Sequence, residues 1–266
     1  MLVNILDSIF AEVIPGTRLY GAPRWMLRGH TVLVGPSHSA EEHEQHVLQT
    51  IGSADWMWSG SDELRFDRKN LLLQSVQFNV PERQVDTSPL LLAWQTARQV
   101  DGQLRLTAAQ GFQVNIADVR WLDSSGETLI CLAEEALVTD QERWRLRVAQ
   151  DLDLLLSQEK WSGFALWHPA RYLVKAWEEP ALEEGSDEEL AKLLYDYCTL
   201  VTDQCVDLME DGDAAIREKL VALYRRIIAP PHWSAQRHVL RHAVEDVLER
   251  FYSRQRDGQG TEEFFS

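Results

Sequence analysis

Hydrophobic and polar residues alternate most regularly between residues 62 and 81, and this stretch predicts a β-hairpin. Apolar and charged side chains alternate up to Phe66, residues 67–70 supply a polar turn, and the alternation resumes as far as Val80. Pro81 ends the pattern, because proline cannot donate a hydrogen bond to a sheet. We therefore expect this hairpin to feed an antiparallel sheet.

A period of two also dominates residues 90–174, which extends the predicted sheet. The clearest segment is residues 143–148, where three apolar residues alternate with three arginines. Nine of the ten tryptophans precede residue 178, and large aromatic rings favour half-buried strands. The pattern predicts an antiparallel, tryptophan-rich sheet in the first two thirds of the chain.

Two helices are predicted near the N-terminus. Apolar positions within residues 2–13 follow helical spacing, and the Pro-Gly pair at 15–16 stops the segment. Ser39 is a suitable N-cap for a second helix, which carries Glu41 and Glu42 in its first turn and an apolar face further on. We expect both helices to lie beside the sheet.

The composition changes at residues 178–185, a charged stretch that contains both proline and glycine. We place a boundary here, between a sheet-containing region over residues 1–177 and a helical region over residues 178–266. About three helices are predicted in the second region, over residues 186 to about 209, 214–228 and 234 to about 252. Their apolar faces need a partner, so we expect them to pack on the sheet in an α+β fold.

The charge of the chain narrows the range of partners. With 42 acidic and 26 basic residues, the formal net charge is −16. Residues 178–266 hold 20 acidic and 10 basic residues, net −10, against net −6 for residues 1–177. Such a surface repels nucleic-acid phosphate and anionic lipid, and it attracts basic macromolecules.

Other features of the sequence indicate the compartment. No apolar run approaches the roughly 20 residues that span a bilayer, and the N-terminal segment lacks the basic start of a signal peptide. Three cysteines, Cys131, Cys198 and Cys205, provide no disulfide framework and fit a reducing environment. We expect a cytosolic protein that binds neither membrane nor nucleic acid.

Acidic side chains gather on one side of the predicted helix that ends near residue 209. A turn of about 100° per residue places them nearly opposite the apolar positions. A row of like charges destabilises a helix by a few tenths of a kcal/mol for each close pair. The row is interpreted either as a solvated face or as a docking surface for a basic partner. Its members are Glu189, Asp196, Asp203, Asp207 and Glu210.

The last predicted helix carries His238, His242 and Glu245, a spacing that is able to chelate one metal ion. The zinc-protease pattern needs glutamate directly after the first histidine, and Val239 stands there. The apolar residues of this helix lie on its other side, which aims the three side chains towards solvent. A solvated face and a weak metal site are therefore both possible interpretations.

Sequence motifs for catalysis or cofactor binding are missing. We find no phosphate-binding glycine-rich loop, nucleophile elbow, Cys-x-x-Cys pair or dinucleotide fingerprint, although active sites can also assemble from scattered residues. We predict a non-enzymatic protein without a cofactor that binds a basic protein, for example an immunity protein that neutralises a toxin. The alternative hypothesis is a metal-dependent hydrolase that uses the helical histidines.

Overall fold

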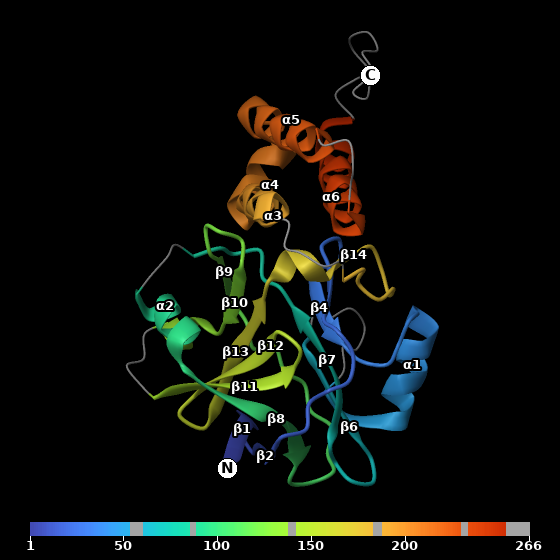
Figure 1. Ribbon diagram of the computed structural model, residues 1–266, viewed down its shortest axis with the longest axis vertical. Coiled ribbons are helices and arrows are strands. Elements are labelled where there is room, and N and C mark those ends of the chain that lie inside the picture. The colour runs from blue at the N-terminus through green and yellow to red at the C-terminus, as the bar shows by residue number, and fades with distance from the viewer. Residues whose placement is uncertain (54–60, 86–88, 138–141, 183–187, 230–233, 254–266) are drawn as a thin grey trace.

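Two β-sheets lie below a layer of C-terminal helices (Figure 1). The structure is a computed structural model, and it describes residues 1–53, 61–85, 89–137, 142–182, 188–229 and 234–253. Within these residues, eight strands form the first sheet, and six of them close into a barrel because β1 also pairs with β13. In spatial order the strands are β1 (Leu2–Leu6), β2 (Ile9–Pro15), β8 (Arg98–Leu106), β11 (Arg143–Ala149), β12 (Leu152–Ser157), β13 (Lys160–Trp167), β10 (Thr128–Leu132) and β9 (Val119–Leu122).

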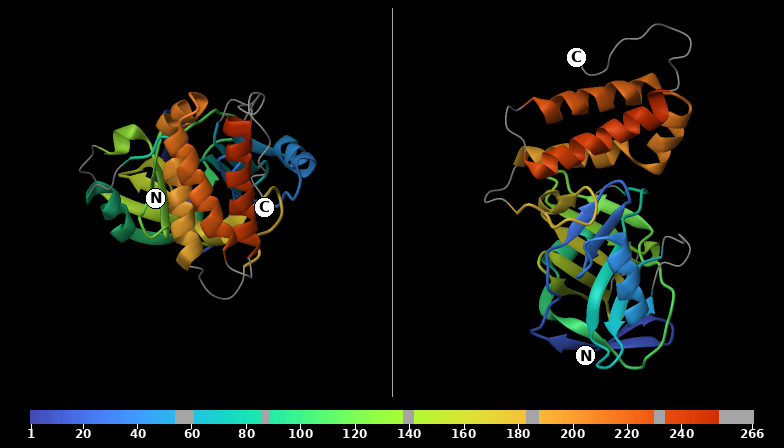
Figure 2. Two further views of the ribbon diagram at one scale, coloured as in Figure 1. Left: turned by 90° about the horizontal axis from the view of Figure 1, so that it is seen from above. Right: turned by 90° about the vertical axis from the view of Figure 1, so that its right-hand side faces the viewer.

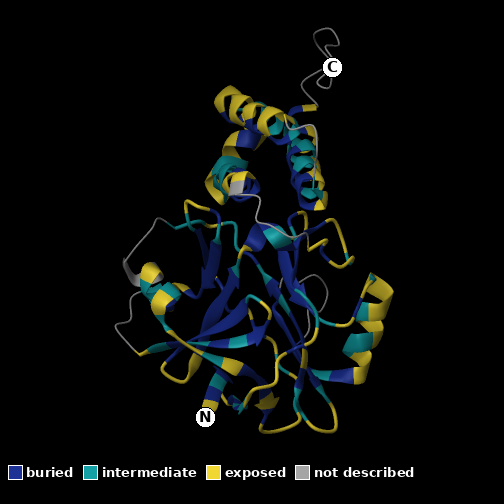
Figure 3. Ribbon diagram, viewed as in Figure 1, coloured by how far each residue is buried: buried dark blue, intermediate teal, exposed yellow. Residues whose placement is uncertain are grey.

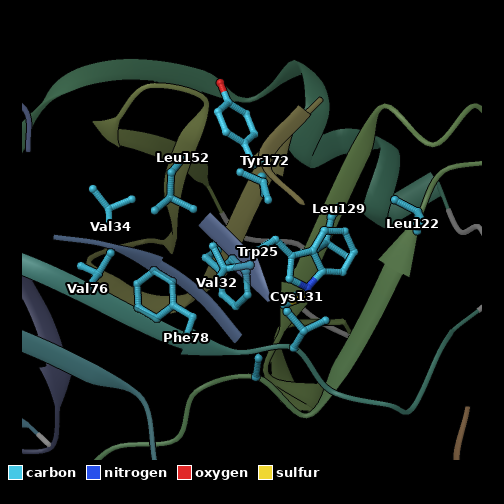
Figure 4. Packing of buried hydrophobic residues seen from close by; sticks show 14 of the residues in the cluster. Trp25, Val32, Val34, Val76, Phe78, Leu122, Leu129, Cys131, Leu152 and Tyr172 are labelled. Carbon is cyan, nitrogen blue, oxygen red and sulfur yellow. The ribbon is translucent and has the colours of Figure 1, made fainter. Parts of the chain in front are cut away.

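The second sheet lies beside the barrel and shares its core. Its strands, in spatial order, are β14 (Leu173–Val174), β3 (Arg24–Met26), β4 (Thr31–Val34), β7 (Leu73–Asn79), β6 (Glu63–Asp67) and β5 (Thr50–Ser53). Apolar side chains from both sheets belong to one cluster of buried residues. Figure 4 shows part of it: Val32, Val34, Val76 and Phe78 from the second sheet and Leu129, Cys131 and Leu152 from the first.

Helices flank the sheets on two sides and cover one end. Helices α1 (Ala40–Gln49) and α2 (Pro89–Thr96) lie on opposite sides of the sheets in Figure 1. The C-terminal helices stack above the barrel (Figure 2). Among the helices that the structure describes, none is long and apolar enough to cross a membrane. The remaining helical segments are η1 (Glu134–Leu137), η2 (Pro169–Tyr172), α3 (Glu188–Leu200), α4 (Asp203–Glu210), α5 (Ala214–Ile228) and α6 (Ala235–Tyr252).

The mixed α+β class with tryptophan in the core is confirmed. The predicted hairpin is present as β6 and β7, and the buried tryptophans include Trp25, Trp121 and Trp161. The expectation of a purely antiparallel sheet was wrong, because β1–β13, β8–β11 and β3–β14 pair in parallel in the described chain. A period of two reports which face of a strand is buried, and it says nothing about the direction of the neighbouring strand.

The N-terminal segment is a hairpin of β1 and β2 and not the predicted helix. Asp7 at the turn has a left-handed backbone, with φ of 42°. Four of the five buried positions carry β-branched side chains, which favour strands. Helical and strand spacing both fit so short an apolar pattern, and pairing with the distant strands β8 and β13 decides between them. The buried residues alternate along both strands: Val3, Ile5, Ile9, Ala11 and Val13.

Helix α1 is held against the second sheet by polar contacts. Ser39 caps it as predicted, but the apolar face expected near its end is not buried, and α1 contains no buried residue. His43 Nε2 lies 3.1 Å from a carboxylate oxygen of Glu63, and His46 Nε2 lies 2.8 Å from Ser75 Oγ. Figure 3 shows the correspondingly exposed outer side of this helix.

The C-terminal helices pack on the end of the barrel, and their apolar faces join the same core. The side-chain amide of Gln236 donates to the carbonyl of Arg171 at 3.2 Å. Gly126, at the turn between β9 and β10, has a φ of 76°, and a Cβ there would lie 2.0 Å from the Ala191 carbonyl on α3. These contacts connect residues before and after position 178. The division of the chain into two regions at that position stays a prediction.

Buried Asp62 is expected to make stability depend on pH. Its two carboxyl oxygens accept the backbone N–H groups of Asn79 and Ile116, each at 2.8 Å. Burial nevertheless raises the pKa of Asp62 to about 7, so the folded state holds this proton above pH 4, where the unfolded chain loses it. The contribution of Asp62 to the free energy of unfolding is therefore largest below pH 4, and it falls by up to about 1.4 kcal/mol per pH unit until pH 7.

Urea unfolding of the wild type and of Asp62→Asn between pH 4 and 8 measures this effect. Asparagine does not titrate, so its curve should lack that part of the slope. The variant also loses one acceptor for a backbone N–H, which shifts its whole curve downwards without changing its slope. Equal slopes for the two proteins would show that Asp62 does not carry the proton.

Candidate functional site

The predicted helix that carries the acidic residues is divided in two. Helix α3 ends at Leu200, and Thr202 caps α4 by accepting the N–H of Cys205 at 3.3 Å. Arg120 of β9 donates one N–H to the carbonyl of Cys198 at 2.7 Å and another to the carbonyl of Val201. Carbonyls at the end of a helix need such partners. The break therefore separates the acidic residues into a group on α3 and a group on α4.

The acidic residues of α3 hold the helical layer together. Glu189 lies 3.0 Å from the guanidinium of Arg237 on α6, whose side chain is only 4% exposed. Asp196 lies 2.5 Å from a guanidinium nitrogen of Arg226 on α5. Both carboxylates are thus paired with a cation of the same helical layer. A partner protein would have to compete with Arg237 and Arg226 to bind them.

The acidic residues of α4 are arranged differently. Asp203, Asp207 and Glu210 are all exposed, and we call these three residues the α4 acidic surface. In the part of the chain that the structure describes, no basic side chain lies within ion-pair distance of any of them, and Arg83 attracts Asp203 only at longer range. Asp203 in the first turn is favourable for the helix dipole, but Glu210 at the opposite end is unfavourable, and the last turn has no basic residue. This arrangement leaves negative charge available at the end of the molecule farthest from the N-terminus (Figure 1).

The alternative metal ligands lie on α6, at the surface of the helical layer. His238 and His242 are exposed, and His242 Nδ1 lies 2.9 Å from one carboxylate oxygen of Glu245. The hydroxyl of Tyr224 donates to the other oxygen of Glu245 at 3.1 Å. Within the described ranges, no group of three or more histidine, cysteine or carboxylate side chains is placed to hold a metal ion. Glu245 also lies 3.5 Å from Arg241 Nε, so binding of a metal would require it to leave three contacts.

Arg120 is the residue of this region that sequence reasoning missed. It lies in β9 between the apolar residues Val119 and Trp121, and it is only 2% exposed. Nothing in its local sequence indicates that it caps a helix about 80 residues later in the chain. A buried arginine on an otherwise apolar strand is unusual, because a buried guanidinium needs several acceptors, and that is the one signal available.

Comparisons with known proteins give no family for this chain. No family model matches the sequence, and no curated protein and no solved structure is significantly similar to it.

Proposed function

We propose that this protein has no catalytic role and binds a basic protein through the α4 acidic surface. The observation that carries the proposal is the exposure of Asp203, Asp207 and Glu210 on one short helix, where no cation of the described chain pairs with them. The rest of the molecule adds to the attraction, because the formal net charge is −16. Complementary charge speeds association and selects among partners.

A cytosolic immunity protein is the most concrete form of this proposal. Such a protein covers the active site of a toxin, and many enzymes that act on nucleic acid are basic because they bind phosphate. A rigid base is useful for this task, since a surface that is ordered before binding loses less conformational entropy. The hydrogen bonds of Arg120 on β9 to Cys198 in α3 and to Val201, two residues before α4, supply such a base.

The metal-dependent hydrolase stays the alternative proposal, and elemental analysis separates it from the first. Protein prepared without a histidine tag is the right sample, because a tag binds metal itself. A stoichiometric metal that is lost in the variant His242→Ala favours the hydrolase. The same measurement with His38→Ala, an exposed histidine of the loop before α1, is the matched control.

Charge reversal of the α4 acidic surface is expected to abolish binding of the basic partner. In the variant Asp203→Lys, Asp207→Lys, Glu210→Lys, three attractive charges become repulsive, while the buried residues of α4 are unchanged. Co-purification from the native host at low salt, followed by mass spectrometry, measures whether a specific basic protein is retained. We expect retention by the wild type, weakening as salt is raised, and loss in the variant.

A control with the same net charge separates the local effect from the global one. Glu41, Glu44 and Glu159 are exposed and lie outside the helical layer, so reversal of these three residues gives the same total charge. This control should retain the partner. Retention by the α4 variant, or equal loss in both variants, would contradict binding through α4.

A further inference from the structure

A cleft of about 730 Å³ lies between the edge of the second sheet and the helical layer. The turn from Leu27 to His30 and the side chain of Glu82 form its lower side, and residues of α3, α4 and α6 form the upper side. Its volume falls within the range of about 300–1,000 Å³ that is usual for ligand sites. Val206 of α4 lines it, so the cleft adjoins the helix that carries the α4 acidic surface.

Tyr197 places an unused polar group in the wall of this cleft. The residue is only 5% exposed, and its hydroxyl has no hydrogen-bond partner among the described residues. Burial is the main cause that raises the pKa of Tyr197. Cys198 adds to it, Arg120 opposes it, and Asp246 and Glu82 make smaller contributions that raise it further. The hydroxyl oxygen is not among the fully enclosed polar atoms without a partner, so it reaches the space of the cleft, where an entering donor is able to bond to it.

Carboxylates around Tyr197 are only loosely neutralised. Asp246 lies 3.4 Å from the guanidinium of Arg28, whose side chain is 78% exposed, and so exposed a pair contributes about 0–1 kcal/mol. Glu82 lies 3.3 Å from His30 Nε2. Burial lowers the pKa of His30, so its ring is neutral at pH 7 and leaves the charge of Glu82 in place.

The Phe251 ring in the same cleft already forms a cation–π contact with Arg250. The guanidinium carbon of Arg250 lies 5.0 Å from the centre of the Phe251 ring. The lining thus offers three carboxylates, from Glu82, Asp246 and Glu249, together with a phenol oxygen and an aromatic ring. It also contains two guanidinium groups, from Arg28 and Arg250, with which an entering cation competes. A guanidinium matches this set better than an ammonium, because it is planar, donates five N–H groups in fixed directions and stacks on rings.

We propose that this cleft receives an arginine side chain of the basic protein that binds the α4 acidic surface. The proposal rests on the proposed function and names the side chain that the partner inserts. The guanidinium donates to Glu82 and Asp246 and also to the oxygen of Tyr197, and it displaces Arg28 into solvent. Arg28 is therefore an internal competitor, and its removal should strengthen binding.

Titration with N-acetyl-argininamide, followed by NMR and calorimetry, tests the cleft directly. This probe carries one guanidinium and no other charge. We expect saturable binding, about ten-fold weaker in Glu82→Gln and about three-fold weaker in Tyr197→Phe. Arg28→Ala should bind the probe more tightly than the wild type does. Tyr195→Phe, on the same helix, and Glu41→Gln, on α1, are the matched controls and should bind like the wild type.

Three results would overturn the proposal: no saturable binding of the probe, equal binding by wild type, Glu82→Gln and Tyr197→Phe, or weaker binding by Arg28→Ala. A fourth result would overturn it as well: N-acetyl-lysinamide should bind less tightly than the arginine probe, and the proposal is wrong if the two affinities are equal. The proposed function fails separately. If the partner still binds after charge reversal on α4, the proposed docking surface is wrong. If the cleft variants bind the probe as tightly as the wild type does, only the proposed arginine site is wrong.

Discussion

Replacement of Asp153 by alanine is expected to lower the free energy of unfolding by about 3–5 kcal/mol. Asp153 on β12 is fully buried, and it accepts hydrogen bonds from Arg145 at 3.0 Å, from Trp167 Nε1 at 2.7 Å and from Arg147. The side chains of the two arginines are 11% and 16% exposed. Alanine would leave two mostly buried cations without this shared counter-charge, and it would also remove the acceptor of the indole N–H.

Urea unfolding at pH 7 measures the loss. Asp153→Asn keeps an acceptor but removes the charge, so it should lie between wild type and alanine. Glu159→Ala, an exposed change on the loop before β13, is the control and should stay within about 0.5 kcal/mol of the wild type. A loss below about 1 kcal/mol for Asp153→Ala would mean that the arginines find other partners.

Replacement of Arg120 by alanine is expected to have the second largest effect, lowering the free energy of unfolding by about 2–4 kcal/mol. The guanidinium of Arg120 satisfies two carbonyls at the end of α3, and it joins the helical layer to β9. Alanine leaves these carbonyls unsatisfied in a buried place and removes the link. Helices α3 and α4 should then open more often than the barrel does, since local opening follows the loss of local contacts.

Hydrogen exchange resolves where Arg120→Ala acts. We expect faster exchange at residues 188–210 and little change in β12 and β13. Arg83→Ala breaks the exposed pair of Arg83 with Glu134 in the same region, and it should cost no more than about 1 kcal/mol. Uniform acceleration throughout the chain would show that Arg120 stabilises the whole fold and not the attachment of the helices. In that case the helical layer and the barrel unfold together.

Local chemistry was enough to locate several elements. Ser39 and Ser234 cap α1 and α6 as predicted, and α5 spans residues 214–228 as predicted. The hairpin of β6 and β7 follows from alternation and its polar turn. In each case the deciding contacts lie within a few residues, so the sequence around the element contains the information.

The arrangement of the acidic residues at the candidate site depends on contacts between residues that are far apart in the sequence. The acidic residues were predicted on one continuous helix, whereas the structure divides them between α3 and α4, and the end of α3 is held by Arg120 on another element. The pairs of Glu189 with Arg237 and of Asp196 with Arg226 likewise join different helices. These contacts determine which carboxylates are exposed at the end of the molecule.

The sequence by itself determined the α+β class, the excess of acidic charge and the positions of the capped helices, because composition and caps act locally. Only the tertiary structure decided that the first residues form strands, that some neighbouring strands run parallel, and that a cleft lies between the helices and the second sheet. A short apolar pattern fits both a helix and a strand. The free energy of pairing with strands far along the chain, which local pattern does not contain, selects between the two.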